Sequence, residues 1–365
     1  MALHIGLMSG TSLDGVDGAL ADFSGETIVT LAAAYIPFPA ALRTELMTLQ
    51  AAGVNEIERE ALAANQLAGI YAQCVAALLA ESGRAAGEIR AVAVHGQTIR
   101  HRPELGYTRQ TNNPALLAEL CGIDVIADFR SRDIAAGGQG APLVPAFHQA
   151  LFGQAGRTRA VANIGGIANI SVLHGDGSVT GFDTGPGNVL MDVWTARHLG
   201  QEYDADGAWA ASGKIIPALL ADLLAEPYFA LPAPKSTGRD LFHPEWLDAK
   251  LAAYPRAAAP DVQATLARLT AQTLARAVQL YATQADALYI CGGGAYNGTL
   301  LRELSLALDG KVKVESTSAL GVAPNRVEAL AFAWLGQRFS ERLAGNLPSV
   351  TGANGARVLG ALYPR

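Results

Sequence analysis

Cysteine, histidine and metal-binding patterns are scarce in this sequence. Its 365 residues include three cysteines, Cys74, Cys121 and Cys291, which lie far apart and form no CxxC pair. This spacing argues against a disulfide framework or a structural zinc site, and it fits a reducing cytoplasm. The seven histidines form no HExxH pattern, so the sequence contains no familiar catalytic zinc motif.

Charge and long apolar runs are scarce as well. Charged residues make up 16% of the chain and the net charge is -6, which gives no electrostatic reason to coat nucleic acid or an anionic membrane. The most apolar stretch, Leu67 to Ala80, is interrupted by Gly69, Tyr71 and Gln73 and is too short to cross a bilayer. The N-terminus lacks a basic region and does not resemble a signal peptide. We therefore expect a cytoplasmic protein with neither nucleic acid nor membrane as a partner.

Apolar residues and glycine, by contrast, are abundant. Hydrophobic residues make up 50% of the chain, which excludes intrinsic disorder. The 39 glycines among 365 residues are about 11% of the chain, against a usual ~7%. They gather in short motifs without a fixed period, which excludes collagen and a flexible linker protein. The glycine-rich motifs are therefore where we look for function.

Short apolar segments alternate with helical patterns along the chain, which predicts an α/β fold. We expect strands at 4–8, 15–23, 90–94, 124–127, 159–163, 168–173 and 287–291. We expect helices over 57–78, from Pro114 to just before Gly122, over 189–197, from a cap at Asp261, and over 326–343.

One strand–turn–strand pattern occurs twice. The first copy is IGLMSGTSLDGVDGALADF, from Ile5, and the second is VANIGGIANISVL, from Val161. This recurrence predicts an internal duplication, and two similar halves would place a ligand in the cleft between them. The expected domains are 1–150 and 151–365, with a tail from about 345 packing back on the first.

Three glycine-rich segments could bind an anion or a nucleotide. Residues 8–17, MSGTSLDGVD, combine small residues and hydroxyls that suit a phosphate and its Mg²⁺, or else form an ordinary hairpin turn. Residues 181–188, GFDTGPGN, would follow a strand and precede a helix, and Asp183 there is either near an anion site or a turn aspartate. Residues 291–298, CGGGAYNG, would end a strand and could accept adenosine.

Several polar residues have two interpretations each. His95 either contacts a ligand or caps its buried strand. The charges in ADFRSRDIAAGGQGA, 127–141, suit a sugar acid or a solvated loop, and Glu328 is either a first-turn helix acid or a hydroxyl ligand. The segment 207–215, GAWAASGKI, is not a Walker A loop, because Ile215 stands where Ser or Thr should bind Mg²⁺.

The ordered set of motifs resembles one family, the anhydro-N-acetylmuramic acid kinases of the sugar kinase, heat-shock-70 and actin superfamily. The motifs are MSGTSLDGVD, VHGQTIRH, ADFRSRDIAAGGQGAPLVP, NIGGIANI, GFDTGPGN and CGGGAYNG. The resemblance implies two duplicated ribonuclease-H-like (actin-like ATPase) domains around a central cleft. It also implies a homodimeric enzyme of peptidoglycan recycling, which uses ATP and Mg²⁺ to convert 1,6-anhydro-N-acetylmuramic acid into N-acetylmuramic acid 6-phosphate and ADP.

The resemblance and the motifs together assign site residues. Asp183 matches the catalytic base. The expected ATP-binding residues are Gly10, Thr11, Ser12, Leu13, Asp14, Gly15, Val16, Asp17, Gly165, Gly166, Gly292, Gly293 and Gly294. The expected substrate-binding residues are His95, Gln97, Arg130, Gly185, Asn188 and Glu328. The Mg²⁺ is expected mainly on the ATP phosphates, with no protein ligands assigned.

Three other functions remain open at this point. An ordinary sugar kinase acting on another hexose would not couple ATP use to opening of an anhydro ring. An ATP-driven conformational protein of the actin or heat-shock-70 type would need a partner-binding domain, and two halves leave no residues for one. A nicotinamide oxidoreductase would need GxGxxG, whereas the third glycine after Gly292 and Gly294 comes one position late, at Gly298.

Overall fold

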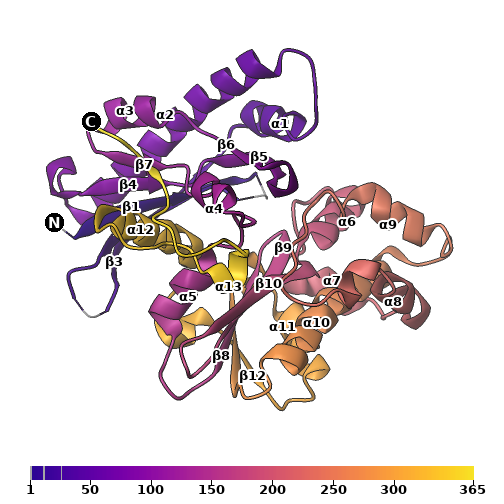
Figure 1. The fold of residues 1–365 in the computed structure, drawn as a ribbon. Coiled ribbons are helices and arrows are strands. Elements are labelled where there is room, and N and C mark those ends of the chain that lie inside the picture. The colour runs from indigo at the N-terminus through magenta and orange to yellow at the C-terminus, as the bar shows by residue number, and fades with distance from the viewer. Residues whose placement is uncertain (1, 11–12, 26) are drawn as a thin grey trace. The chain divides into compact units, whose positions relative to one another are not determined.

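The chain divides into two units in the computed structural model, which describes residues 2–10, 13–25 and 27–365 (Figure 1). Unit 1 contains Met1–Phe147 and Arg326–Arg365, and unit 2 contains His148–Asn325. The chain therefore leaves unit 1 near residue 147 and returns to it at Arg326. The sequence suggested a return only from about 345.

Unit 1 contains a mixed sheet, a hairpin and flanking helices. The sheet strands are β1 (Leu3–Met8), β2 (Gly15–Asp22), β3 (Val29–Pro37), β4 (Ala91–Val94), β7 (Val125–Ala127) and β13 (Ala361–Tyr363), and the hairpin strands are β5 (Gln97–Arg102) and β6 (Tyr107–Thr111). The helices are α1 (Ala40–Thr48), α2 (Glu56–Ser82), α3 (Pro114–Cys121), α4 (Ser131–Ala135), α12 (Val327–Ser340) and α13 (Pro348–Thr351). Helix α5 (Val144–Phe152) contains the point where the two units divide.

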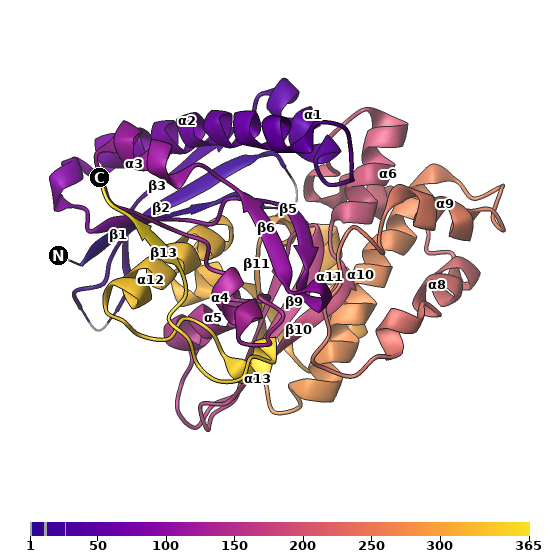
Figure 2. The same ribbon diagram turned by 45° about the horizontal axis from the view of Figure 1, so that its top comes forward.

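Helices cover both faces of the unit 1 sheet, whose strand order is β13-β7-β4-β1-β2-β3. Helix α2 packs on β2 and β3, and α12 packs on β1, β2 and β4 (Figure 2). Small residues bring α12 close to the strands: a Cβ on Gly6 would lie 1.9 Å from the carbonyl oxygen of Ala329, and one on Gly336 would lie 2.7 Å from the Cβ of Ala93. Because of this close fit, α12 belongs to unit 1 although it follows unit 2 in the sequence.

Unit 2 is built from a second mixed sheet and its own helices. Its strands are β8 (Arg159–Ile164), β9 (Ile167–Leu173), β10 (Val179–Pro186), β11 (Ala287–Cys291) and β12 (Lys313–Ser316). Its helices are α6 (Val189–Leu199), α7 (Ala208–Ser212), α8 (Pro217–Leu224), α9 (Pro244–Leu251), α10 (Ala259–Tyr281) and α11 (Gly298–Ala307). The amphipathic helix α10 packs on β9 and β10 and carries the largest share of the apolar core of this unit.

The two sheets share one topology. In unit 1, β1, β2 and β3 pair antiparallel in sequence, and β4 and then β7 add parallel on the other side of β1. In unit 2, β8, β9 and β10 pair antiparallel, and β11 and then β12 add parallel beyond β8. The duplication predicted from the strand–turn–strand repeat is confirmed by this strand order. Strand β13 is extra, because the end of the chain pairs antiparallel with β7.

The apolar stretch from Leu67 to Ala80 was expected to be too short to cross a bilayer, but helix α2, which contains it, is long and apolar enough to do so by length and composition. Half of its most apolar stretch is buried inside the protein, however, and the core helix of a globular unit passes the same test. Leu67, Tyr71 and Leu78 are fully buried in the unit 1 core, so packing on the sheet accounts for the apolar character of α2.

The starts of helices α3 and α10 are stabilised in different ways. The Asn113 side chain accepts a hydrogen bond from the Leu116 amide, as an N-cap residue does. Asp261 was expected to cap α10, and that prediction is wrong: the N-cap is Ala258, and Asp261 lies in the first turn. Its carboxylate instead accepts from the Lys214 amide at 2.7 Å, so it joins α10 to the segment before α8.

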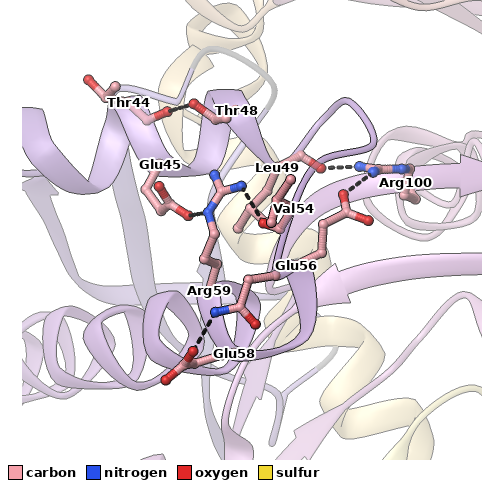
Figure 3. A network of polar contacts seen from close by, with 10 residues as sticks. Thr44, Glu45, Thr48, Leu49, Val54, Glu56, Glu58, Arg59 and Arg100 are labelled. Carbon is pink, nitrogen blue, oxygen red and sulfur yellow. Dashed lines mark hydrogen bonds and ion pairs between the residues drawn. The ribbon is translucent and has the colours of Figure 1, made fainter.

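A polar network fixes the loop between α1 and α2 (Figure 3). The Arg100 guanidinium on β5 pairs with Glu56 at 2.5 Å and also donates to the carbonyl oxygen of Leu49. Arg59 on α2 pairs with Glu45 on α1 at 2.7 Å and donates to the carbonyl oxygen of Val54. The β5–β6 hairpin is thereby tied to both helices.

Candidate active site

The glycine turns of unit 2 meet at the carboxyl ends of β8 and β11. The carbonyl oxygens of the β8–β9 turn accept hydrogen bonds from the segment after β10, from the Gly187 amide to Gly166 at 2.9 Å and from the Asn188 amide to Gly165 at 2.8 Å. A Cβ on Gly187 would lie 2.3 Å from the Gly165 carbonyl oxygen. Only glycine permits this approach of two main-chain segments.

The turn after β11 lies against the same end of β8. A Cβ on Gly292, whose φ is 76°, would lie 2.3 Å from the Asn163 side-chain oxygen, and one on Gly294 would lie 2.4 Å from the Ile164 side chain. Gly293 is exposed. The structure therefore brings the two predicted glycine turns of unit 2 together and leaves main chain accessible beside them.

Asn188 connects these two turns. It is the N-cap residue of α6, and its side-chain amide donates to the Ile164 carbonyl oxygen at 3.2 Å. A Cβ on Gly293 would lie 3.5 Å from that same amide nitrogen. Asn188 was expected to contact the sugar, and the structure places it among the expected ATP-binding residues.

Asp183 lies inside β10, at a bulge. The pairing of β10 with β9 shifts between Asp183 and Gly185. The segment 181–186 is the end of β10. The sequence suggested that this segment would follow a strand, and that prediction is wrong. Gly185 has φ 147°, and a Cβ there would lie 2.6 Å from the Phe229 ring. The bulge changes the direction of the strand beside the half-buried Asp183. It requires glycine at position 185.

One segment, Tyr228–Thr237, holds Asp183 through both its main chain and its side chain. The Tyr228 hydroxyl donates to the Asp183 carbonyl oxygen at 2.6 Å, and the Asp183 amide donates to the Lys235 carbonyl oxygen at 3.1 Å. Oδ2 of Asp183 accepts from the Ser236 hydroxyl at 2.8 Å and from the Thr237 amide at 3.1 Å.

Sequence reasoning missed this segment. It has neither helical nor strand periodicity, and it lies about 50 residues from Asp183 along the chain. One signal was available: KSTG, 235–238, has the same mixture of hydroxyls and glycine as the motif at 9–12. Burial lowers the pKa of Lys235, whose ammonium group donates to the Tyr228 carbonyl oxygen at 3.0 Å.

In unit 1 the imidazole of His95 connects the end of β1 to the Arg130 loop. Its Nδ1 donates to the Ser9 carbonyl oxygen at 3.2 Å, and its Nε2 accepts from the Arg130 guanidinium at 3.0 and 3.1 Å. Burial, and then the charge of Arg130, lower the pKa of His95 to about 3, so the ring is neutral at pH 7. Arg130 also donates to the Gly140 carbonyl oxygen at 2.7 Å.

Gln97 and the first phosphate motif are joined as well. The fully buried Gln97 donates through Nε2 to the Gly10 carbonyl oxygen at 3.0 Å. Leu13 and Val16 place their side chains in the unit 1 core, so only their main chain is available to a ligand. Of the other expected ATP-binding residues, Thr11 and Ser12 lie outside the described residues.

Three carboxylates of unit 1 interact electrostatically near this motif. Burial raises the pKa of Asp17 to about 7, and the negative charges of Asp14 and Glu328 add to the effect. Glu328 lies in the first turn of α12. It therefore belongs to unit 1, beside the first phosphate motif, although the sequence suggested the second half of the chain.

Known proteins give a consistent match to the whole chain. The profile of the anhydro-N-acetylmuramic acid kinase family matches residues 2–365. The chain belongs to this family. An anhydro-N-acetylmuramic acid kinase of Cupriavidus pinatubonensis is 61% identical over 99% of this chain and 98% of its own length, and one of Burkholderia orbicola is 58% identical over 100% and 96%.

A solved structure shares the fold of this family member. Component A of the (R)-2-hydroxyglutaryl-CoA dehydratase from Acidaminococcus fermentans matches with a TM-score of 0.50 at 10% identity, over 91% of this chain and 96% of that one. At this identity the likeness concerns the fold alone. The protein has the duplicated ribonuclease-H-like fold, and family membership excludes the oxidoreductase and the purely conformational ATPase among the alternatives.

Proposed function

We propose that Asp183 is the general base of this anhydro-N-acetylmuramic acid kinase. Family membership makes the protein an ATP-dependent sugar kinase that opens the 1,6-anhydro ring of 1,6-anhydro-N-acetylmuramic acid and phosphorylates O6, a step of peptidoglycan recycling. The observation that carries the role of Asp183 is its half-buried carboxylate at the β10 bulge, on the strand that runs directly into the glycine contact at Gly187.

The substrate explains why a base is needed although O6 carries no proton. In an ordinary kinase the base assists the attacking hydroxyl, but here O6 is tied to C1 in the anhydro bridge. Asp183 takes a proton from water, the water oxygen forms a bond to C1, and the C1–O6 bond breaks. O6 takes the γ-phosphoryl group, and the bond to the β-phosphate oxygen breaks to release ADP. One carboxylate then acts as the base of an inverting glycosidase does, and the phosphoryl group replaces the general acid.

We propose the glycine turns of unit 2 as part of the ATP site. The β8–β9 turn at Gly165 and Gly166 serves as the second phosphate loop, and the turn at 292–294 accepts adenosine. Their mutual contact, and the N-terminus of α6 beside them, support this assignment, because main-chain amides at a helix N-terminus attract phosphate. The first phosphate loop is Gly10 to Asp17 of unit 1.

The Mg²⁺ of the proposal would be held mainly by ATP phosphates. Among residues 2–10, 13–25 and 27–365, there is no group of three or more His, Cys, Asp or Glu side chains that could hold a metal ion. Asp17 fits a place near the cation, because a positive charge would offset the burial and the neighbouring negative charges that raise its pKa to about 7. When bound, Mg²⁺ neutralises phosphate charge.

For the sugar we propose Arg130 as the group that binds the lactyl carboxylate. Its guanidinium is half-buried and is held by His95 and Gly140, which suits recognition of a planar acid. Gln97 and Glu328 are proposed as hydroxyl partners, whereas His95 acts through Arg130 because both of its ring nitrogens have partners within unit 1. A homodimer and a cytoplasmic location complete the proposal.

Isotope incorporation tests the coupled reaction. The enzyme is incubated with ATP, Mg²⁺ and the anhydro sugar in ¹⁸O-water, and the product is analysed by mass spectrometry and NMR. Label at C1 of a 6-phosphorylated product is expected, because water attacks C1 while O6 stays with the sugar. An unlabelled product would refute the mechanism.

The Asp183→Asn variant tests the base. We expect product formation to fall at least ~100-fold, because the amide cannot accept the proton of water, with ATP binding by calorimetry within about twofold of the wild type. Asp176→Asn, on the exposed turn after β9, is the control. Turnover of Asp183→Asn at the wild-type rate would remove Asp183 from the mechanism.

A further inference from the structure

The contacts around Asp183 extend its function to a neighbouring segment that the sequence motifs did not include. Oδ2 of Asp183 accepts two hydrogen bonds from consecutive residues, at 2.8 Å from the Ser236 hydroxyl and at 3.1 Å from the Thr237 amide. Two donors on one oxygen fix the plane of a carboxylate, because rotation about its Cβ–Cγ bond would break both bonds.

We propose that Ser236 is a positioning residue for the catalytic base: its hydroxyl, together with the Thr237 amide, sets the orientation in which Asp183 receives the proton of the attacking water. The inference rests on the proposed role of Asp183. Proton transfer needs the base within hydrogen-bond reach of water in one geometry, and small misplacements of a reacting group are costly in rate.

The rest of the segment makes this support rigid. The Tyr228 hydroxyl donates to the Asp183 carbonyl oxygen at 2.6 Å, and the Lys235 ammonium group donates to the Tyr228 carbonyl oxygen at 3.0 Å while lying 4.5 Å from the centre of its ring. Tyr228 is buried in the unit 2 core. The donor pair at 236–237 is therefore anchored to the core rather than placed on a loosely held loop.

The exposure of Ser236 separates this role from a structural one. Its side chain is exposed, so removing the hydroxyl leaves no cavity in the core and little unfolding is expected. A matched contact exists elsewhere in unit 2: on the turn after β9, the Ser178 hydroxyl and amide both donate to Oδ1 of Asp176, at 2.6 and 2.8 Å. Ser178→Ala therefore removes a similar contact on the turn that precedes β10, outside the segment that bonds the Asp183 carboxylate.

The experiment compares Ser236→Ala, Ser236→Thr and Ser178→Ala with the wild type by steady-state kinetics and thermal melting. We expect Ser236→Ala to lower kcat roughly tenfold, the loss of one hydrogen bond to a charged group. The KM values for ATP and the anhydro sugar and the melting temperature should change little. Ser236→Thr should restore kcat, because it restores the hydroxyl, and Ser178→Ala should behave as the wild type.

Three results would overturn the inference. One is a wild-type kcat for Ser236→Ala. Another is a higher KM for the sugar with unchanged kcat, which would make Ser236 a substrate contact. The third is a Ser236→Thr variant as slow as Ser236→Ala. The proposed function fails separately, through an active Asp183→Asn variant, so the two failures are distinguishable.

Discussion

At the residue scale, a close contact between two main-chain segments explains why residue 187 of unit 2 is a glycine. The segment after β10 touches the β8–β9 turn so closely that a Cβ on Gly187 would overlap the Gly165 carbonyl oxygen. Thr270 of α10 supports this contact from behind, because its hydroxyl lies 2.9 Å from the Gly187 carbonyl oxygen. The main chain after β10 thus holds the proposed phosphate loop, and a side chain of α10 holds that main chain in turn.

Gly187→Ala tests this contact. The added methyl group must push the β8–β9 turn away from α6, so we expect the KM for ATP to rise at least ~10-fold and stability to fall by about 1–3 kcal/mol. Gly69→Ala is the control, because a Cβ there meets nothing within 4 Å. Kinetics and urea unfolding measure both effects, and wild-type affinity for ATP in Gly187→Ala would contradict the assignment.

At the scale of elements, the buried Asp133 joins the Arg130 loop to the end of the chain. Its carboxylate accepts from the Gly140 amide at 2.8 Å, from the Asn346 side chain at 2.7 Å and from the Thr351 hydroxyl at 2.8 Å. Asp133 is fully buried, and a buried carboxylate is tolerated when donors surround it. The segment after α12 is therefore a structural partner of α4.

Thr351→Val tests this connection. The exchange keeps the shape and removes one donor from a buried charge, so we expect a loss of about 1–3 kcal/mol in unfolding free energy. A raised KM for the sugar should accompany it if Arg130 binds the substrate. Thr351→Ser keeps the hydroxyl and should remain close to the wild type in urea unfolding. Equal stability of Thr351→Val and the wild type would show that the connection is unimportant.

Local sequence patterns predicted helices and strands, whereas contacts between distant segments determine which residues lie together in the candidate site. The repeat starting at Ile5 and Val161 revealed the two sheets, because apolar runs and glycine turns are local signals. The sequence placed Glu328 with the second half, and nothing local indicates that α12 crosses back to the first sheet. The support of Asp183 by Ser236 was missed for the same reason, since a hydrogen bond between distant segments has no periodicity.

At the scale of the whole molecule, buried histidines in both units make stability depend on pH. Burial lowers the pKa of His148 in unit 2 to about 3 and that of His4 in unit 1 to about 4, as it does for His95. Below pH 6.5 these histidines bind protons in the unfolded chain, whereas in the folded chain their side chains stay neutral. The stability that these histidines contribute is therefore complete above about pH 6.5 and is lost as the pH falls toward 3. Asp17, whose pKa is raised to about 7, acts in the opposite direction and offsets part of this loss.

The melting temperature measured between pH 8 and pH 4 tests this dependence. We expect it to be flat above pH 7 and to fall steadily below 6.5, with each buried histidine costing at most about 1.4 kcal/mol per pH unit. His148→Gln keeps a polar group beside Ser171 and cannot take up the proton, so its decline should be shallower. A decline as steep as that of the wild type would show that His148 contributes nothing.

The order in which the units are synthesised follows from the path of the chain. Unit 1 needs α12 and β13, which come after the whole of unit 2. At 5–20 residues per second, the about 180 residues of unit 2 take a ribosome roughly 10–35 s. During that time the apolar face of β1, β2 and β4 lacks its helix. The nascent chain therefore presents an uncovered sheet to the cell's chaperones. Unit 2 is continuous in the sequence, so its synthesis is complete before that of unit 1.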